Sequence, residues 1–161
     1  MVYSYKNPIK RLKSDEQLSY IKGLIEKYRL NYIEDAFQQE DFLGFAQLRK
    51  EIIKERACLL VGDDLIASQL ARLKEALMKR AVNSIIVKPN QNGSLIEIKK
   101  LIDIAKKYEV ATIMSHRSGE TLDYSIADLA FGFSCDFVKF GIKGREREIK
   151  LNRLIEIDKS L

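Results

Sequence analysis

The sequence has no tryptophan and only two cysteines, two prolines and one histidine in 161 residues. The two cysteines, Cys58 and Cys135, cannot form a disulfide framework, and their spacing matches no metal-binding cysteine motif. No apolar run approaches the roughly 18 residues of a membrane span, and the N-terminal stretch MVYSYKNPIKRLK has no apolar signal-peptide core. These absences predict a soluble protein of the reducing cytoplasm with no membrane partner.

Nucleic-acid binding also has no signal in the sequence, although the formal net charge is +5. Acidic and basic residues alternate in stretches such as KSDEQ, RKEIIKER and KGREREIK, which is typical of solvated helix faces. A nucleic-acid-binding protein would instead show a basic stripe interleaved with aromatic residues, or a known binding motif. We therefore expect no nucleic-acid partner.

What the sequence does contain is a repeated unit. Five short apolar, β-prone runs recur at intervals of roughly 25 residues, about the length of one strand, one helix and two loops. The runs are LNYIE, ACLLVG, SIIVK, VATIMS and DFVKF, and they end near Glu34, Gly62, Lys88, Ser115 and Lys139. Helical patterns accompany them near 14–28, 41–55, 68–80, 94–108, 121–132 and 144–157.

This alternation indicates a parallel sheet covered by helices, an α/β fold. Two helix starts have capping-box spacing, Ser14 with Gln17 and Ser94 with Glu97. No linker interrupts the series, so residues 1–161 are predicted to form one domain. An open doubly wound sheet and a (β/α) barrel both fit. The first strand is not followed by G-x-G-x-x-G, which disfavours the dinucleotide-binding version.

Polar side chains gather where the predicted strands end. They include carboxylates, lysines and residue types that bind phosphate: Glu34, Asp63, Lys88, His116, Arg117, Ser118 and Lys139. An aspartate at a strand-to-helix turn is most often a helix N-cap, but agreement among five strand exits is difficult to explain by capping alone. In barrels and open α/β sheets the carboxyl end of the strands carries the chemistry. We therefore expect a ligand-directed site at this end.

The segments YIEDAF, LVGDDL, VKPNQNGSL, SHRSGETLDYSIADL and KLNRLIEI, in this order, resemble the enolase family, and SHRSGET alone is close to diagnostic. The resemblance runs from about Tyr3 to the end of the sequence and corresponds to the later part of an enolase. It implies a partial (β/α) TIM barrel of about five parallel strands with outer helices. The implied activity is the Mg²⁺-dependent dehydration of 2-phosphoglycerate to phosphoenolpyruvate in glycolysis, a lyase reaction.

The resemblance also implies roles for four residues at the strand exits. Glu34 and Asp63 match carboxylates that bind Mg²⁺, a cation that prefers hard oxygen ligands. Lys88 matches the general base that removes the proton α to the substrate carboxylate, and Lys139 matches the lysine that pairs with that carboxylate. A metal at this position would stabilise the doubly charged enolate.

A second group of matching residues concerns the substrate phosphate. His116, Arg117 and Ser118 match the phosphate-binding segment, which implies a phosphorylated small-molecule ligand similar to 2-phosphoglycerate. Arg117 offers a forked donor to phosphate oxygens, and backbone N–H groups at a helix start are expected beside it. Pro89 stands where the family usually has a non-proline residue, and it should hold Lys88 in an extended conformation.

The family's N-terminal domain and first three barrel strands have no counterpart in this sequence. In enolases those parts supply the third Mg²⁺ carboxylate and the acidic residues that assist loss of the hydroxyl. Two hypotheses stay open. One is an enolase-type enzyme that is active when the missing half complements it. The other is a catalytically inactive, enolase-derived protein that binds phosphate and Mg²⁺ or acts through oligomeric interactions.

Five strands cannot close an eight-stranded barrel, so an apolar inner face is expected to need a cover. Some of the following side chains must face inward: Leu30, Tyr32, Leu59, Val61, Ile85, Val87 and Ile113. The simplest cover is a second copy in a homo-oligomer or a complementary chain. The alternative is that residues 1–13 or the C-terminal helix fold over the open face.

Overall fold

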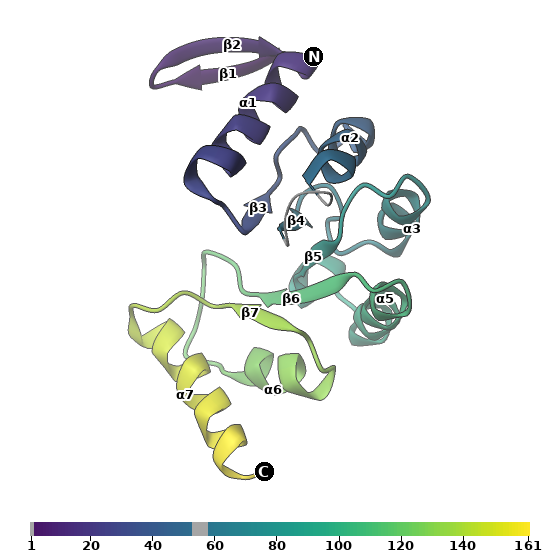
Figure 1. Ribbon diagram of the computed structural model, residues 1–161. Coiled ribbons are helices and arrows are strands. Elements are labelled where there is room, and N and C mark those ends of the chain that lie inside the picture. Colours follow the sequence, from purple (N-terminus) through teal and green to yellow (C-terminus); the bar gives the residue numbers. More distant parts are fainter. Residues whose placement is uncertain (1, 53–57) are drawn as a thin grey trace.

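Five parallel strands form a curled sheet whose spatial order follows the chain (Figure 1). In the computed structural model, which describes residues 2–52 and 58–161, the strands are β3 (Tyr32–Glu34), β4 (Leu59–Gly62), β5 (Ser84–Val87), β6 (Ala111–Ser115) and β7 (Phe137–Lys139). A doubly wound sheet would reverse its order from a central strand. The sequential order is that of a barrel wall, which confirms the predicted partial barrel with five parallel strands.

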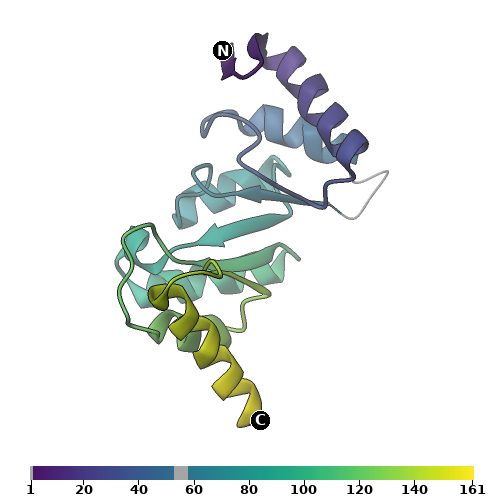
Figure 2. The ribbon, with the colours of Figure 1, turned by 90° about the vertical axis from the view of Figure 1, so that its left-hand side faces the viewer.

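Helices cover the outer side of this wall (Figures 1 and 2). They are α1 (Ser14–Tyr28), α2 (Phe42–Ile52), α3 (Leu70–Met78), α4 (Pro89–Asn92), α5 (Leu95–Lys107), α6 (Ser125–Gly132) and α7 (Arg145–Lys159). Among the described residues, no helix is both long and apolar enough to pass through a lipid bilayer.

Side chains alternate between the two faces of the sheet, as the two-residue period of a strand requires. Leu60, Ile85 and Val87 are fully buried in the main core between sheet and helices. Val61, Ile86 and Ile113 form a second, smaller cluster on the inner face, where they are at most 3% exposed. Because the sheet curls, these side chains at the centre of its inner face pack against one another.

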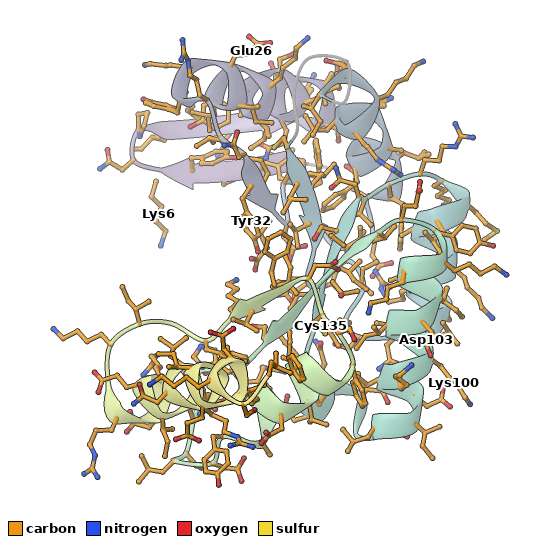
Figure 3. The ribbon with its side chains drawn as sticks, turned by 60° about the horizontal axis from the view of Figure 1, so that its bottom comes forward. Lys6, Glu26, Tyr32, Lys100, Asp103 and Cys135 are labelled. Atoms are coloured by element: carbon orange, nitrogen blue, oxygen red, sulfur yellow. The ribbon has the colours of Figure 1, made fainter. Side chains whose placement is uncertain are left out.

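Within the described residues, the inner face is open beside its two edge strands. Tyr32 on β3 is 40% exposed and Phe137 on β7 is 50% exposed. Together with Leu59 and Ile113 they line a hollow of about 380 Å³. Figure 3 shows Tyr32 at this open side of the sheet. The expectation that some of the seven apolar residues face inward is confirmed by Val61 and Ile113, whereas Ile85 and Val87 belong to the outer core and Leu30 packs against it.

Residues 2–13 form an antiparallel hairpin that the sequence analysis did not predict, with β1 (Val2–Lys6) paired to β2 (Ile9–Lys13). The Tyr5 ring packs edge-on against Tyr20 of α1 at 5.1 Å between centroids, and the Tyr5 hydroxyl donates to Gln17 at 2.8 Å. The hairpin thus lies against α1, while α7 packs against α6 (Figure 1). Neither element covers the inner face.

Helix boundaries follow local hydrogen bonds. The Ser94 hydroxyl accepts from the Glu97 N–H, as predicted. The predicted Ser14–Gln17 box is wrong, because the box lies one residue earlier: the Lys13 N–H donates to Glu16. Of the helix expected over 41–55, residues 42–52 are helical, and 53–55 lie outside the described residues.

Candidate active site

The predicted site residues all lie at one end of the sheet, where the strands finish. Glu34 ends β3, Lys139 ends β7, and Asp63, Lys88 and His116 directly follow β4, β5 and β6. Parallel strands bring their carboxyl ends to the same edge, so five separate sequence segments converge there. We call the four charged residues Glu34, Asp63, Lys88 and Lys139 the charged rim.

Asp63 and Lys88 form the more buried half of the charged rim. Lys88 Nζ lies 2.6 Å from each carboxylate oxygen of Asp63, and the two side chains are 13% and 11% exposed. Burial raises the pKa of Asp63, although the Lys88 ammonium acts in the opposite direction. The ion pair therefore holds the lysine in one place while keeping its charge balanced.

The backbone around Lys88 explains its position. Lys88 has φ −120° and ψ 101°, and Pro89 occupies the first position of α4, so the predicted extended conformation is confirmed. The Lys88 N–H donates to the buried hydroxyl of Ser68 at 2.9 Å. Sequence reasoning missed Ser68, because an isolated serine in a loop carries no signal of this contact.

Glu34 and Lys139 form the second ion pair of the rim, and they come from the opposite edges of the sheet. Lys139 Nζ lies 2.5 Å from Glu34 Oε2, which also accepts from the Tyr32 hydroxyl at 2.6 Å. Burial opposes ionisation of Glu34, but the Lys139 ammonium and the Tyr32 hydroxyl outweigh it and lower the pKa of the carboxyl. Side chains thus bridge the gap between β3 and β7.

The two ion pairs are joined through their carboxyl groups. The negative charge of Glu34 also raises the pKa of Asp63, so the two carboxyl groups are electrostatically linked. Asp35 supports the junction, since its two carboxylate oxygens accept from the N–H groups of Asp63 at 3.0 Å and Asp64 at 2.9 Å. The charged rim is therefore one connected network from β3 through β4 and β5 to β7.

The segment predicted to bind phosphate is more exposed. The Arg117 and Ser118 side chains are solvent-exposed, and within the described residues no hydrogen bond or ion pair joins them to the charged rim. His116 is closer, because its backbone N–H donates to the Lys139 carbonyl oxygen with an N···O distance of 3.4 Å. The expected helix start beside Arg117 is wrong, because α6 begins only at Ser125 and residues 116–124 form a loop.

This loop is tied to α7 by Lys150, a residue that sequence reasoning missed. Lys150 is 1% exposed, and its Nζ lies 2.9 Å from Glu120 Oε2 and donates to the carbonyl oxygens of Thr121 and Glu146. Glu120 in turn accepts from the Arg117 N–H at 3.0 Å. A buried lysine thus fixes the loop that presents Arg117.

The surroundings of His116 are positively charged. Burial lowers the pKa of the imidazole, and Arg147, Lys150 and Lys139 lower it further, against the opposite effect of Glu120. The His116 Nδ1 is buried and has no hydrogen-bond partner among the described residues. An imidazole beside several cations, with a ring nitrogen that has no partner among the described residues, is suited to contact an anionic ligand.

Comparison with known proteins gives a family for this arrangement. The family model "Enolase, C-terminal TIM barrel domain" matches residues 3–161. Enolase from Methanocorpusculum labreanum is 46% identical over 156 residues, which are 97% of this chain and 38% of that protein. Enolase from Archaeoglobus fulgidus is 40% identical over 149 residues, 92% of this chain and 36% of that protein. The chain thus spans less than two fifths of the length of these relatives.

Proposed function

The chain belongs to the enolase family, and from that premise we propose that it supplies the proton-abstracting and anion-binding side of an enolase active site. The proposed reaction converts 2-phosphoglycerate to phosphoenolpyruvate: C2 loses a proton, and the hydroxyl on C3 leaves as water. The observation that supports this proposal is the charged rim, in which two lysines and two carboxylates meet beside the His116–Ser118 segment.

Lys88 is the proposed general base. Its Nζ is held at 2.6 Å from both Asp63 oxygens, so it must release its own proton and part of this pairing before it accepts the C2 proton. Lys139 is proposed to bind the substrate carboxylate, which would take the place that Glu34 occupies here. Binding of the substrate would therefore replace ion pairs within the protein by ion pairs between the protein and the ligand.

Arg117, Ser118 and His116 are proposed to bind the phosphate group. The exposed Arg117 guanidinium can donate two parallel hydrogen bonds to phosphate oxygens. The neighbouring cations Arg147 and Lys150, which also act on His116, would favour a dianion at this position. The group that protonates the departing hydroxyl is not among the residues that match the family here.

We propose Glu34 and Asp63 as part of a Mg²⁺ site. The charge of Glu34 acts on Asp63, so one divalent cation could be bound by both carboxylates. Within the described residues no group of three or more His, Cys, Asp or Glu side chains could hold a metal ion, so further oxygen ligands must come from elsewhere. When bound, Mg²⁺ supplies charge stabilisation for the enolate oxygens.

An activity assay tests the enzymatic proposal. The 161-residue chain would be mixed with the part of the M. labreanum enolase that precedes its matched segment, and phosphoenolpyruvate would be measured with Mg²⁺ present. We expect activity in the mixture, and a loss of about 10²–10⁴-fold with Lys88→Ala, the usual effect of removing a positioned general base. Turnover that is unchanged by Lys88→Ala would contradict the assignment of the base.

A second candidate function is ligand binding without turnover. It is favoured by the internal pairing of all four rim charges, in which Lys88 is held by Asp63 and Lys139 by Glu34. Phosphoglycerate binding in calorimetry, with no turnover in any mixture of the assay above, would establish this function. In either case Mg²⁺ should bind weakly alone and more tightly with the phosphorylated ligand, because two carboxylates leave several coordination positions to water.

We further propose that a second copy or a complementary chain covers the open side of the sheet. Within the described residues β3 and β7 each have a strand neighbour on one side only, and the hollow between them exposes Tyr32, Phe137 and Val138. Unpaired edges and exposed apolar side chains favour association. Light scattering at micromolar concentration should show a species larger than 18.6 kDa, and a clean monomer would contradict self-association.

A further inference from the structure

A cavity of about 920 Å³ lies at the end of the sheet opposite the charged rim. Its walls come from α2, from Leu77–Arg80 at the end of α3, and from Tyr108–Val110 after α5. The second of these segments ends three residues before β5 and the third directly precedes β6, whereas the charged-rim residues end or follow their strands. Figure 1 shows α2, α3 and α5 next to one another along the outer side of the sheet. The cavity is thus separate from the proposed active site.

The cavity walls carry four cationic side chains: Arg49, Lys50, Lys79 and Arg80. Only Glu109 contributes an acidic side chain to the described wall. Lys79 is paired with Glu75 at 2.7 Å, but within the described residues no ion pair is formed by the other three cations. This corner of the surface therefore holds positive charge that the described part of the protein does not neutralise.

Arg49 is the most constrained of these cations. Its Nε is buried and finds no hydrogen-bond acceptor among the described residues. Burial lowers the pKa of its guanidinium, and the nearby positive charge of Arg80 lowers it further. A buried donor that lacks an acceptor, in the same cavity wall as a second guanidinium, is stabilised when an anion supplies the missing oxygen atoms.

Helix ends explain why the cations gather here. Arg49 and Lys50 lie in the last turn of α2, and Lys79 and Arg80 follow α3, where the partial negative charge of a helix C-terminus favours them. The helix ends also disfavour a bound anion. An anion in this cavity must therefore be held by the side chains, and its affinity must depend on each of them.

The other part of the cavity wall is apolar and accessible. Tyr108 is 58% exposed and Leu43 is 66% exposed, and the wall also includes the half-buried Leu77 and the buried Val110. An exposed aromatic ring beside cations offers a stacking platform for a planar group, as in many nucleotide-binding sites. The volume is in the range of small-molecule sites, about 300–1,000 Å³.

We propose that this cavity binds a small molecule of the nucleoside diphosphate class, with its phosphates on Arg49 and Arg80 and its base on Tyr108. Two guanidinium groups in the wall of one cavity match two linked phosphates, and the exposed ring accounts for an aromatic portion. Lys50 and Lys79 lie at the same wall and add to the attraction at low ionic strength.

The test uses calorimetric titration of the whole chain with ADP and with pyrophosphate at low ionic strength. The parent protein carries Arg117→Ala, which removes the anion site proposed beside the charged rim. Arg80→Gln should weaken both ligands by about 10- to 100-fold, the effect of one lost charged hydrogen bond. Tyr108→Ala should weaken ADP by about tenfold and leave pyrophosphate unchanged. Both residues are exposed, so their replacement should not unfold the chain, which circular dichroism verifies.

The matched control is Lys159→Gln, an equal change of charge at an exposed position at the end of α7. It should leave both affinities within about twofold, as expected for a screened distant charge. Equal weakening by Lys159→Gln, or loss of ADP binding on introducing Arg117→Ala, would overturn the proposal. Two further results would also overturn the proposal: single-stranded RNA that binds more tightly than ADP, or an ADP affinity that Tyr108→Ala leaves unchanged.

Discussion

The charged rim and the loop of residues 116–124 lie side by side, but their charges are arranged in opposite ways. In the rim every cation has a carboxylate partner within the protein, at 2.6 Å for Lys88 and 2.5 Å for Lys139. In the loop Arg117 and Ser118 point into solvent, and the buried Lys150 fixes the backbone that carries them. The rim is internally neutralised, whereas the loop presents unneutralised positive charge.

This difference indicates whether the charged rim or the loop can bind a ligand first. A phosphate can reach Arg117 without breaking any described ion pair, while a carboxylate or a metal must displace a lysine or a carboxylate from the rim. We therefore expect the phosphate group to bind first, without requiring Mg²⁺, and the rim to rearrange afterwards. Four predictions, ordered from the largest expected effect to the smallest, test this comparison.

The largest effect should follow from Lys150→Met, which keeps the apolar stem and removes the charge that anchors the loop. Glu120 would lose its buried partner and two carbonyl oxygens would lose a donor, so we expect a loss of about 3–5 kcal/mol in unfolding free energy. Urea denaturation measures this. The matched change Lys143→Met, at an exposed position, should have an effect within ±0.5 kcal/mol. Equal stability of the two variants would show that Lys150 does not anchor the loop.

Arg117→Ala should weaken phosphate binding by about 1.5–3 kcal/mol, the usual contribution of a hydrogen bond to a charged group. Because the side chain is exposed, the free energy of unfolding should stay within about 0.5 kcal/mol of the parent. Calorimetric titration with inorganic phosphate gives the affinity. Lys88→Ala is the comparison variant, and it should leave phosphate affinity nearly unchanged. A larger loss with Lys88→Ala would place the phosphate in the rim.

Glu34→Gln should lower the unfolding free energy at pH 7 by about 1 kcal/mol, a modest value because the pair is partly exposed. The folded-state pKa of Glu34 is lowered, so its contribution is present above the unfolded pKa near 4.3 and disappears as the pH falls through the folded pKa. Urea titrations at pH 7 and at about pH 3 should therefore show a difference from the parent that shrinks toward zero. Asp103→Asn, in an exposed helical pair with Lys99, should have a smaller effect at both pH values.

The smallest effect concerns His116, the only histidine of the sequence, whose imidazole signal in an NMR titration is therefore unambiguous. Without ligand its pKa should lie below the ordinary histidine value, because burial and the surrounding cations oppose protonation. Bound phosphate should raise that pKa, since a negative charge favours the imidazolium. The Arg117→Ala variant should not show the rise. If phosphate leaves the pKa of His116 unchanged, His116 is not part of the phosphate site.

The strands were predictable because their signal is local. Each apolar run is as long as a buried strand, and the residue that follows it lies at the carboxyl end of the sheet whatever the distant contacts are. The hairpin of residues 2–13 was missed for the opposite reason. Its side chains alternate between exposed and half-buried, and its packing depends on Tyr5 meeting Tyr20 and Gln17 of α1. The hairpin sequence contains no apolar pattern that would predict this contact.

The late start of α6 and the anchoring by Lys150 could not be predicted from short-range patterns either. Asp123 accepts from the Ser125 N–H, and the Thr121 hydroxyl accepts from the Asp123 N–H, so local side-chain bonds hold 121–124 outside the helix. Lys150 lies in the charged stretch KGREREIK, which we expected to be solvated, and its partner Glu120 is 30 positions away. A charge that becomes buried looks, in sequence, the same as one that stays in water.

The ion pair between Glu34 and Lys139 has a consequence for the order in which the chain folds. It closes a loop of 105 residues, and closing such a loop in an unfolded chain costs on the order of 4 kcal/mol in entropy. A partly exposed ion pair returns about 1 kcal/mol at most, so it cannot form before the sheet has curled. It should therefore be absent from the folding transition state, and its removal should accelerate unfolding while leaving the folding rate nearly constant.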